Sequence, residues 1–303
     1  MTQSQFLEPE GADLDRKIIA VLKRAPRASA STVATEVGSP RAVVARRIRE
    51  LLDSQSVRVS AAVNPDFLGI GVMAHLSIRV VGAATGVAEW LAEHTDAVFV
   101  SLVTGPIDII AEMREPGYDE LHARLAELRQ HPDVHTVTTC IYSRVYRGGT
   151  FTEPAQPIDV DDLDRELIAL LQADGRMGYQ ALADTVRLSP SAVRARMQRL
   201  VSSNVIRLGA VEARGKSGRQ LAIGVGIRLA ADPHDLMRMF AQSPHVDFAM
   251  DVLGHYDVVA TLTAATPVEL LALIEELRVR EDTVHVDSWL HLNTVKEDFT
   301  RLI

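Results

Sequence analysis

A run of arginines on one predicted helix is the clearest chemical feature of this 303-residue chain. Residues 187–207 carry five arginines and no acidic residue, although the chain as a whole has a formal net charge of −8. Arginines on an exposed helix face can neutralise DNA phosphates and read base edges. The DNA-binding residues that we predict on this helix are Ser189, Ser191, Arg194, Ala195, Arg196, Gln198 and Arg199.

The spacing of apolar residues predicts how this helix is positioned. Val193, Met197 and Leu200 form one buried stripe, and Ser189-Pro190 supplies an N-cap followed by proline at the first helical position. Two shorter amphipathic helices precede it, separated by the helix-breaking pair Asp174-Gly175. Three short helices of which the last is basic are typical of a helix-turn-helix domain that reads DNA.

The same pattern occurs 149 residues earlier in the chain. Residues 14–59 and 163–208 share 14 identities in 46 ungapped positions, and the same offset aligns later residues. The chain is therefore a tandem duplication of a unit of about 150 residues. The first copy has its own exposed arginines, which are partly offset by Glu50 and Asp53. The predicted DNA-binding residues of this copy are Arg46, Arg47 and Arg49.

Each helix-turn-helix segment is followed by alternating apolar strands and two helices in the order βαββαβ, which predicts a ferredoxin-like domain. We expect an α+β fold in which a winged helix-turn-helix and a ferredoxin-like βαββαβ domain form a unit that is repeated twice. The first βαββαβ segment is predicted from strands at 72–80, 97–103, 107–113 and 134–145. The predicted domains are the helix-turn-helix domains 13–59 and 163–208, the ferredoxin-like domains 71–146 and 220–303, and the linker 147–162.

A Gly-x-x-Asp pattern recurs at the predicted turn between the second and third strands of each ferredoxin-like domain. Glycine permits an unusual turn conformation, and the carboxylate can meet the ammonium group of a ligand. Both residue types are also ordinary hairpin residues, and this alternative stays open. The effector-binding residues that we predict are Gly254, His255, Tyr256, Asp257, Gly105 and Asp108.

Three segments together resemble the leucine-responsive and asparagine-synthetase regulators, the Lrp/AsnC family. They are LDRELIALLQADGR, LSPSAVRARMQRL and the turn Gly254-His255-Tyr256-Asp257. The resemblance covers nearly the whole chain twice, and the first copy departs from it at Pro26 and in Gly105-Pro106-Ile107-Asp108. It implies a sequence-specific transcriptional regulator with amino-acid effectors bound near this turn, and a fused pseudo-dimer. It also implies that the ferredoxin-like domains 71–146 and 220–303 serve as effector and oligomerisation domains.

The rest of the composition limits the alternatives. The single cysteine, Cys140, excludes an internal disulfide framework, and the ten histidines show no metal-ligand spacing. No local Ser-His-Asp or Cys-His arrangement predicts an enzyme, so we expect no metal and no cofactor beyond an amino-acid effector. No apolar run approaches the ~20 residues that span a bilayer. We expect a cytoplasmic protein that binds double-stranded DNA, not membranes, as a homo-oligomer of two or four chains.

Two other functions fit parts of the sequence. An architectural protein that compacts DNA with little sequence preference also presents many basic helices. Siroheme decarboxylases share this fold and occur as two-unit proteins, but their Asn-Tyr and Trp-Phe signature is missing from residues 71–80 and 218–229. For the regulator, recognition helices about 34 Å apart read successive major-groove faces. The exposed residues of the two helices differ, which predicts half-sites that are not identical.

Overall fold

The computed structural model describes residues 12–147, 155–212 and 221–298, and these form two compact units. The first unit contains the described residues up to Ala62 and from Pro157 to Glu212, which include both helix-turn-helix segments. The remaining described residues form the second unit. Residues 148–154 of the predicted linker lie outside the described residues.

Each helix-turn-helix domain has three helices around a small apolar core. The turn between the second and third helices uses equivalent left-handed residues, Gly38 (φ 67°) and Arg187 (φ 57°). In the first domain the core is closed by buried Ile18, Leu22 and Val44. The helices are α1 (Ala12–Arg24), α2 (Ala30–Val37) and α3 (Arg41–Asp53), then α6 (Asp162–Ala173), α7 (Tyr179–Val186) and α8 (Pro190–Ser202).

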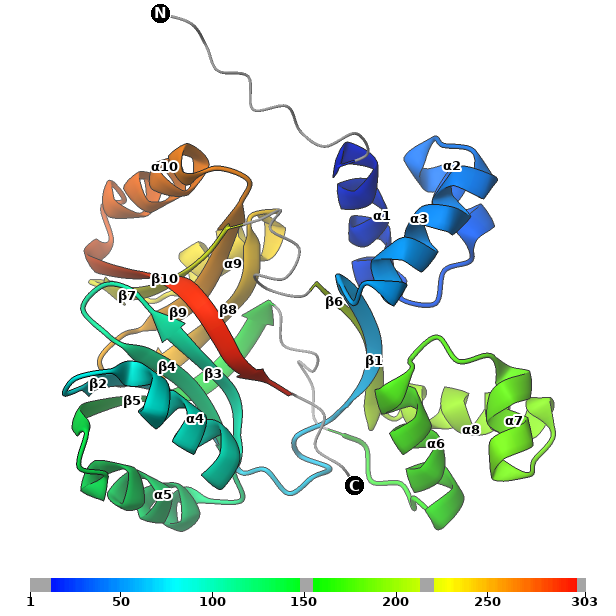
Figure 1. Cartoon of the computed structure of the whole chain (residues 1–303), viewed down its shortest axis with the longest axis horizontal. Coiled ribbons are helices and arrows are strands. Elements are labelled where there is room, and N and C mark those ends of the chain that lie inside the picture. Colours follow the sequence, from blue (N-terminus) through cyan, green and yellow to red (C-terminus); the bar gives the residue numbers. More distant parts are fainter. Residues whose placement is uncertain (1–11, 148–154, 213–220, 299–303) are drawn as a thin grey trace, which may run out of the picture. The chain divides into compact units, whose positions relative to one another are not determined.

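A strand follows the third helix of each domain, and the two strands pair with each other. These are β1 (Val57–Val63) and β6 (Ile206–Glu212), which form a two-stranded sheet (Figure 1). Ala210 of β6 also packs against the core of the first domain. The predicted domain limits at 59 and 208 fall inside these strands, because the alternation of buried residues in β1 continues beyond Val59. The two helix-turn-helix domains are thus joined within one unit.

The second unit contains both βαββαβ segments in one closed eight-stranded barrel (Figure 1). The strand order is β10-β3-β4-β2-β5-β8-β9-β7, so the repeats join through antiparallel pairs β5–β8 and β3–β10. The strands are β2 (Val72–Val80), β3 (Ala97–Val103), β4 (Ile109–Glu115) and β5 (Val134–Arg147), then β7 (Leu221–Leu229), β8 (Val246–Leu253), β9 (Val258–Ala264) and β10 (Thr283–Glu297).

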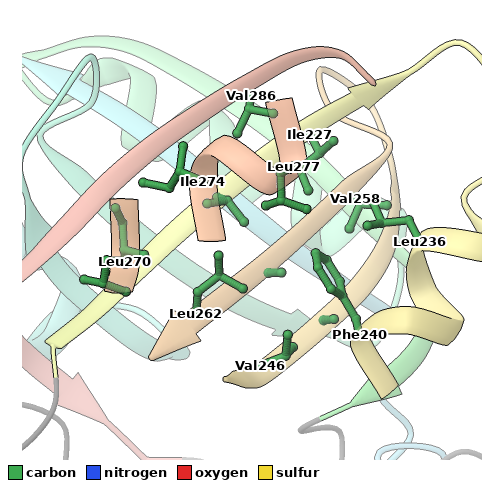
Figure 2. Close-up of a cluster of buried hydrophobic side chains, with 14 of the residues drawn as sticks. Ile227, Leu236, Phe240, Val246, Val258, Leu262, Leu270, Ile274, Leu277 and Val286 are labelled. Atoms are coloured by element: carbon green, nitrogen blue, oxygen red, sulfur yellow. The ribbon is translucent and has the colours of Figure 1, made fainter. Parts of the chain in front are cut away.

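Two helices from each repeat cover the outer face of its half of the barrel. In the second repeat, Leu236 and Phe240 of α9 and Ile274 and Leu277 of α10 pack over the strands, as Figure 2 shows. An equivalent cluster lies beneath the helices of the first repeat. The helices are α4 (Ala84–His94) and α5 (Tyr118–Gln130), then α9 (His234–Gln242) and α10 (Pro267–Arg278). Among the described residues, no helix is both long and apolar enough to cross a membrane.

The barrel interior is a third cluster, to which both repeats contribute. Trp289 and Tyr256 fill the half nearer the second repeat, where the neighbouring strand β7 carries Gly224 and Gly226. A Cβ atom at either glycine would overlap these rings. The inner sheet faces of the two repeats are thus buried against each other. The sequence did not predict that the sheet edges of the two repeats hydrogen-bond to each other to form one barrel.

Strand β4 differs from the limits that the sequence predicts for it. The apolar pattern predicts a strand over 107–113, whereas β4 spans Ile109–Glu115. The Asp108 amide donates to Ile78 O at 3.0 Å, and its carboxylate accepts from the Val80 amide at 2.9 Å. These bonds hold Asp108 in the turn, so the strand begins after it, at Ile109.

Candidate functional site

The exposed face of α8 presents most of the residues predicted to contact DNA. Ser189 caps the helix, and its Oγ accepts from the Ala192 amide at 3.2 Å. Ser191 lies beside it, with the two hydroxyl oxygens 3.0 Å apart. Arg194 is exposed and makes no ion pair with any described residue. The exposed members of this face are Ser189, Ser191, Arg194, Ala195, Gln198 and Arg199.

Arg196 has a different environment, because it binds the first turn of α6. Its Nη1 lies 2.9 Å from Oδ1 of Asp164, which is fully buried, and 2.8 Å from Oδ2 of Asp161. The hydrogen bonds to Asp164 and Asp161 raise the pKa of the Arg196 guanidinium. Arg199 also binds Asp164. These bonds hold α8 against α6, and a DNA contact by Arg196 stays a prediction.

The first domain repeats this arrangement with Arg47. Its Nε lies 2.8 Å from Oδ1 of Asp15, which is 1% exposed, and its Nη1 lies 2.6 Å from Oε2 of Glu50. The bond with Asp15 raises the pKa of Arg47. Arg47 and Arg196 are equivalent, as are Asp15 and Asp164, so both domains fix their third helix by one arginine and one buried aspartate.

The exposed positions of the two third helices are not the same. Arg46 pairs with Glu50 at 3.3 Å, whereas Arg49 is exposed without an ion pair among the described residues. At the 149-residue offset, Glu50 corresponds to Arg199, so the same position is acidic in one helix and basic in the other. The cation without an ion pair among the described residues therefore lies at different positions, Arg49 on α3 and Arg194 on α8.

Sequence reasoning missed the two buried aspartates that position these helices. Asp164 is the third residue of a capping box in which its amide donates to Asp161 Oδ1 at 2.8 Å. A carboxylate in the first turn of a helix is favoured by the helix dipole, which is a signal present in the sequence. The shared triplet Leu-Asp-Arg at 14–16 and 163–165 is a second signal.

The predicted effector turns have equivalent geometry in both repeats. The Asp257 carboxylate accepts from the Leu229 amide at 2.8 Å, just as Asp108 accepts from Val80. Each aspartate thus has a structural role in its turn. Gly105 (φ 113°) and Gly254 (φ 148°) have backbone conformations that L side chains rarely adopt.

The same turns lie against the last strand of the other repeat. A Cβ at residue 254 would lie 2.7 Å from Thr139 O in β5, and one at residue 105 would lie 3.0 Å from Ser288 O in β10. Thr139 and Ser288 are equivalent positions. Each predicted effector turn therefore lies at a junction between the repeats, with backbone too close for any side chain but glycine.

The two rings at the second turn differ in exposure. His255 is exposed, and its ring centroid lies 4.7 Å from that of Tyr256. Tyr256 is 3% exposed and its hydroxyl donates to Asp287 Oδ2 at 2.9 Å. Burial and this hydrogen bond raise the pKa of the Tyr256 hydroxyl. The Tyr256 ring packs in the barrel interior against Gly226, and an effector contact by Tyr256 stays a prediction.

Comparison with known proteins identifies a family domain in each repeat and relatives of part of the chain. The AsnC-type helix-turn-helix domain matches residues 13–52 and 160–201. An uncharacterized HTH-type transcriptional regulator of Pyrococcus horikoshii is 29% identical over 145 residues, 47% of this chain and 92% of that protein. The HTH-type transcriptional regulator AldR of Mycobacterium tuberculosis is 41% identical over 61 residues, 20% of this chain and 34% of that protein. One repeat thus corresponds to nearly a whole Pyrococcus regulator.

A likeness over the whole chain comes from a solved structure. The siroheme decarboxylase NirDL superposes with a TM-score of 0.61 and 14% identity, covering 94% of this chain and 92% of that chain. At this identity the comparison shows a shared fold that extends over both repeats.

Proposed function

We propose that this chain is a DNA-binding transcriptional regulator of the Lrp/AsnC family that carries the regulator unit twice, and that its two helix-turn-helix domains bind the two halves of one operator. The observation that carries the proposal is the exposed face of α8. Ser189 and Ser191 lie at the helix N-terminus, where backbone amides and the helix dipole favour a phosphate. Arg194 is free of ion pairs among the described residues and extends from the same face.

The two halves of the operator are not identical in this proposal. Base discrimination depends on exposed side chains, and α8 offers Arg194, Gln198 and Arg199 where α3 offers Ala45, Arg49 and Glu50. A homodimer must present the same helix twice, whereas a duplicated chain is free of that restriction. The fused repeats thus suit an asymmetric operator.

A small effector, with an amino acid as the first candidate class, is proposed at the β8–β9 turn. Support comes from Gly254, which brings this turn against Thr139 O of the other repeat, and from the exposed ring of His255. A ligand at such a junction contacts both repeats and can change how they pack.

Assembly of two or four chains is proposed as well, supported by the exposed apolar residues Val268 (76%) and Leu271 (56%) of α10.

Fluorescence anisotropy with the DNA upstream of the chain's own gene tests the regulator function. The control is scrambled DNA of equal composition, at two salt concentrations, with and without a pool of amino acids. Tighter, salt-sensitive binding to the upstream DNA supports a sequence-specific regulator, and a change in Kd with one amino acid identifies the effector. Equal binding to both DNAs supports an architectural protein instead.

The likeness to NirDL supports one further measurement on the same sample. Siroheme is added and its absorbance spectrum is recorded with and without the protein. An unchanged spectrum, together with specific DNA binding, agrees with the regulator function. A saturable spectral shift without DNA binding would favour an enzyme on this fold.

A further inference from the structure

Two equivalent arginines, Arg27 and Arg176, connect the helix-turn-helix domains to each other. Arg27 Nη1 donates to Gly175 O at 2.9 Å and its Nη2 donates to Met177 O at 2.7 Å. Arg176 donates in the opposite direction, from Nη1 to Pro26 O and from Nη2 to Ala28 O at 2.9 Å. All of these positions are related by the 149-residue offset. Each domain thus donates the same two hydrogen bonds to the other, with pseudo-two-fold symmetry.

The chemistry of this contact favours a specific role over ordinary surface packing. Each guanidinium uses its planar fork to bind two carbonyl oxygens, a geometry that lysine cannot reproduce. The two cations lie close enough that burial and the charge of Arg27 together lower the pKa of Arg176. Two half-buried like charges repel each other, so the hydrogen bonds to the carbonyls must offset that repulsion.

The surrounding backbone strengthens the same junction. The Gly175 amide donates to Val59 O of β1 at 2.9 Å, and a Cβ at residue 175 would lie 3.0 Å from the Ser60 backbone. Arg27 also lies over the Tyr179 ring, 5.0 Å from its centroid. The bonded carbonyls belong to the turns between the first and second helices. The contact therefore joins the backbone of one helix-turn-helix domain directly to the other domain.

We infer that Arg27 and Arg176 hold α3 and α8 at a fixed separation and thereby determine the spacing between the half-sites that the protein accepts. This inference rests on the proposed binding of one two-part operator. Adding one base pair turns a half-site by about 34° around the helix axis. Two recognition helices that are held rigidly cannot follow that rotation, whereas two helices in loosely joined domains can.

The fixed separation is tested first without DNA, by pulsed electron–electron distance measurement. Spin labels are placed on S31C and Q180C, equivalent exposed positions in α2 and α7. Cys140, the single native cysteine, is buried, so the introduced thiols are the reactive ones. A narrow distance distribution is expected in the otherwise unchanged chain and a broad one in R27A/R176A. R27K/R176K keeps both charges and is expected to broaden the distribution as well.

The matched control is R16A/R165A, which removes two arginines at equivalent positions without touching this junction. Arg16 binds Asp13, and Arg165 binds Asp162, each within its own helix. The control is expected to keep the narrow distribution, and thermal unfolding confirms that every variant is folded. A distribution in R27A/R176A as narrow as in the control overturns the inference.

Spacing specificity is then tested on DNA. A site is selected from random duplexes with the unchanged protein, and variants of that site gain or lose one or two base pairs between the half-sites. The unchanged protein and the R16A/R165A control are expected to lose ~10-fold or more in Kd, because one recognition helix loses its base contacts. R27A/R176A is expected to lose less than about 3-fold. Equal losses in all three proteins overturn the inference. If no site is selected at all, the proposed operator binding fails, while the spin-label result still decides whether the arginines fix the domains.

Discussion

Asp164 and Arg196 form an ion pair across the second helix-turn-helix domain, with Nη1 2.9 Å from Oδ1 of the buried carboxylate. The pair joins the first turn of α6 to the middle of α8, and Arg47 and Asp15 form its counterpart in the first domain. Arginines on one helix thus divide into those that hold the helix and those that are free to meet DNA. Substitutions of the two kinds of arginine should therefore affect stability and DNA binding differently.

Arg194→Ala and Arg196→Ala are expected to affect different properties. Removing Arg194 weakens specific DNA binding by ~1–3 kcal/mol if it reads a base, with little change in stability. Removing Arg196 lowers the free energy of unfolding by about 1–2 kcal/mol, because the buried Asp164 loses one cation but keeps Arg199. Urea unfolding and anisotropy on the same preparations separate the two effects. Equal stability of both variants would contradict the division.

Glu50→Ala is expected to strengthen DNA binding by the first domain. Glu50 accepts from Arg46 and Arg47 and places a negative charge where the second domain has Arg199. Its removal frees Arg46 for a phosphate, so the plot of log Kd against log salt should become steeper by up to about one unit. Glu127→Ala in α5 makes the same charge change in the second unit and serves as the control. A slope that changes equally in both variants would refute the assignment.

His75 makes the stability of the protein depend on pH. Burial lowers the pKa of His75 from 6.5 to about 4. The unfolded chain therefore binds a proton that the folded chain does not, so this contribution is fully present above pH 6.5 and is lost as pH falls toward 4. The loss amounts to about 3 kcal/mol at most. Urea unfolding between pH 4 and 8 should show a shallower decline for His75→Gln than for the unchanged chain. Parallel declines would exclude His75 as the source.

Gly224→Ala tests the complementary packing of the barrel interior. A Cβ at this position overlaps the indole nitrogen of Trp289, which is 2% exposed. We expect a loss of roughly 1–3 kcal/mol or more in stability, since overpacking a closed core displaces side chains. Trp289 emission, recorded with W90F present, should also change. Gly86→Ala in α4 meets no atom within 4 Å and should be neutral or stabilising by up to ~1 kcal/mol.

The sequence by itself determined the local elements and the duplication. The heptad-like spacing around Ile18 and Leu167 and the Ser189-Pro190 cap are local signals, because helix periodicity and capping involve residues within a few positions of one another. The alternation in residues 72–80 predicted the first strand of the first ferredoxin-like segment with its observed limits. The exposed arginine face of α8 follows from the same periodicity.

Tertiary structure alone decided which side chains meet across long separations. Arg196 and Asp164 are 32 positions apart, so their pairing depends on how α8 docks against α6. Closure of the barrel through β5–β8 and β3–β10 uses backbone groups that every residue carries, and no side-chain pattern specifies the partner of a strand edge. The exchange between Arg27 and Arg176 likewise requires the two repeats to be brought together. Both arginines are identities in the repeat alignment, and only the folded chain shows what they bind.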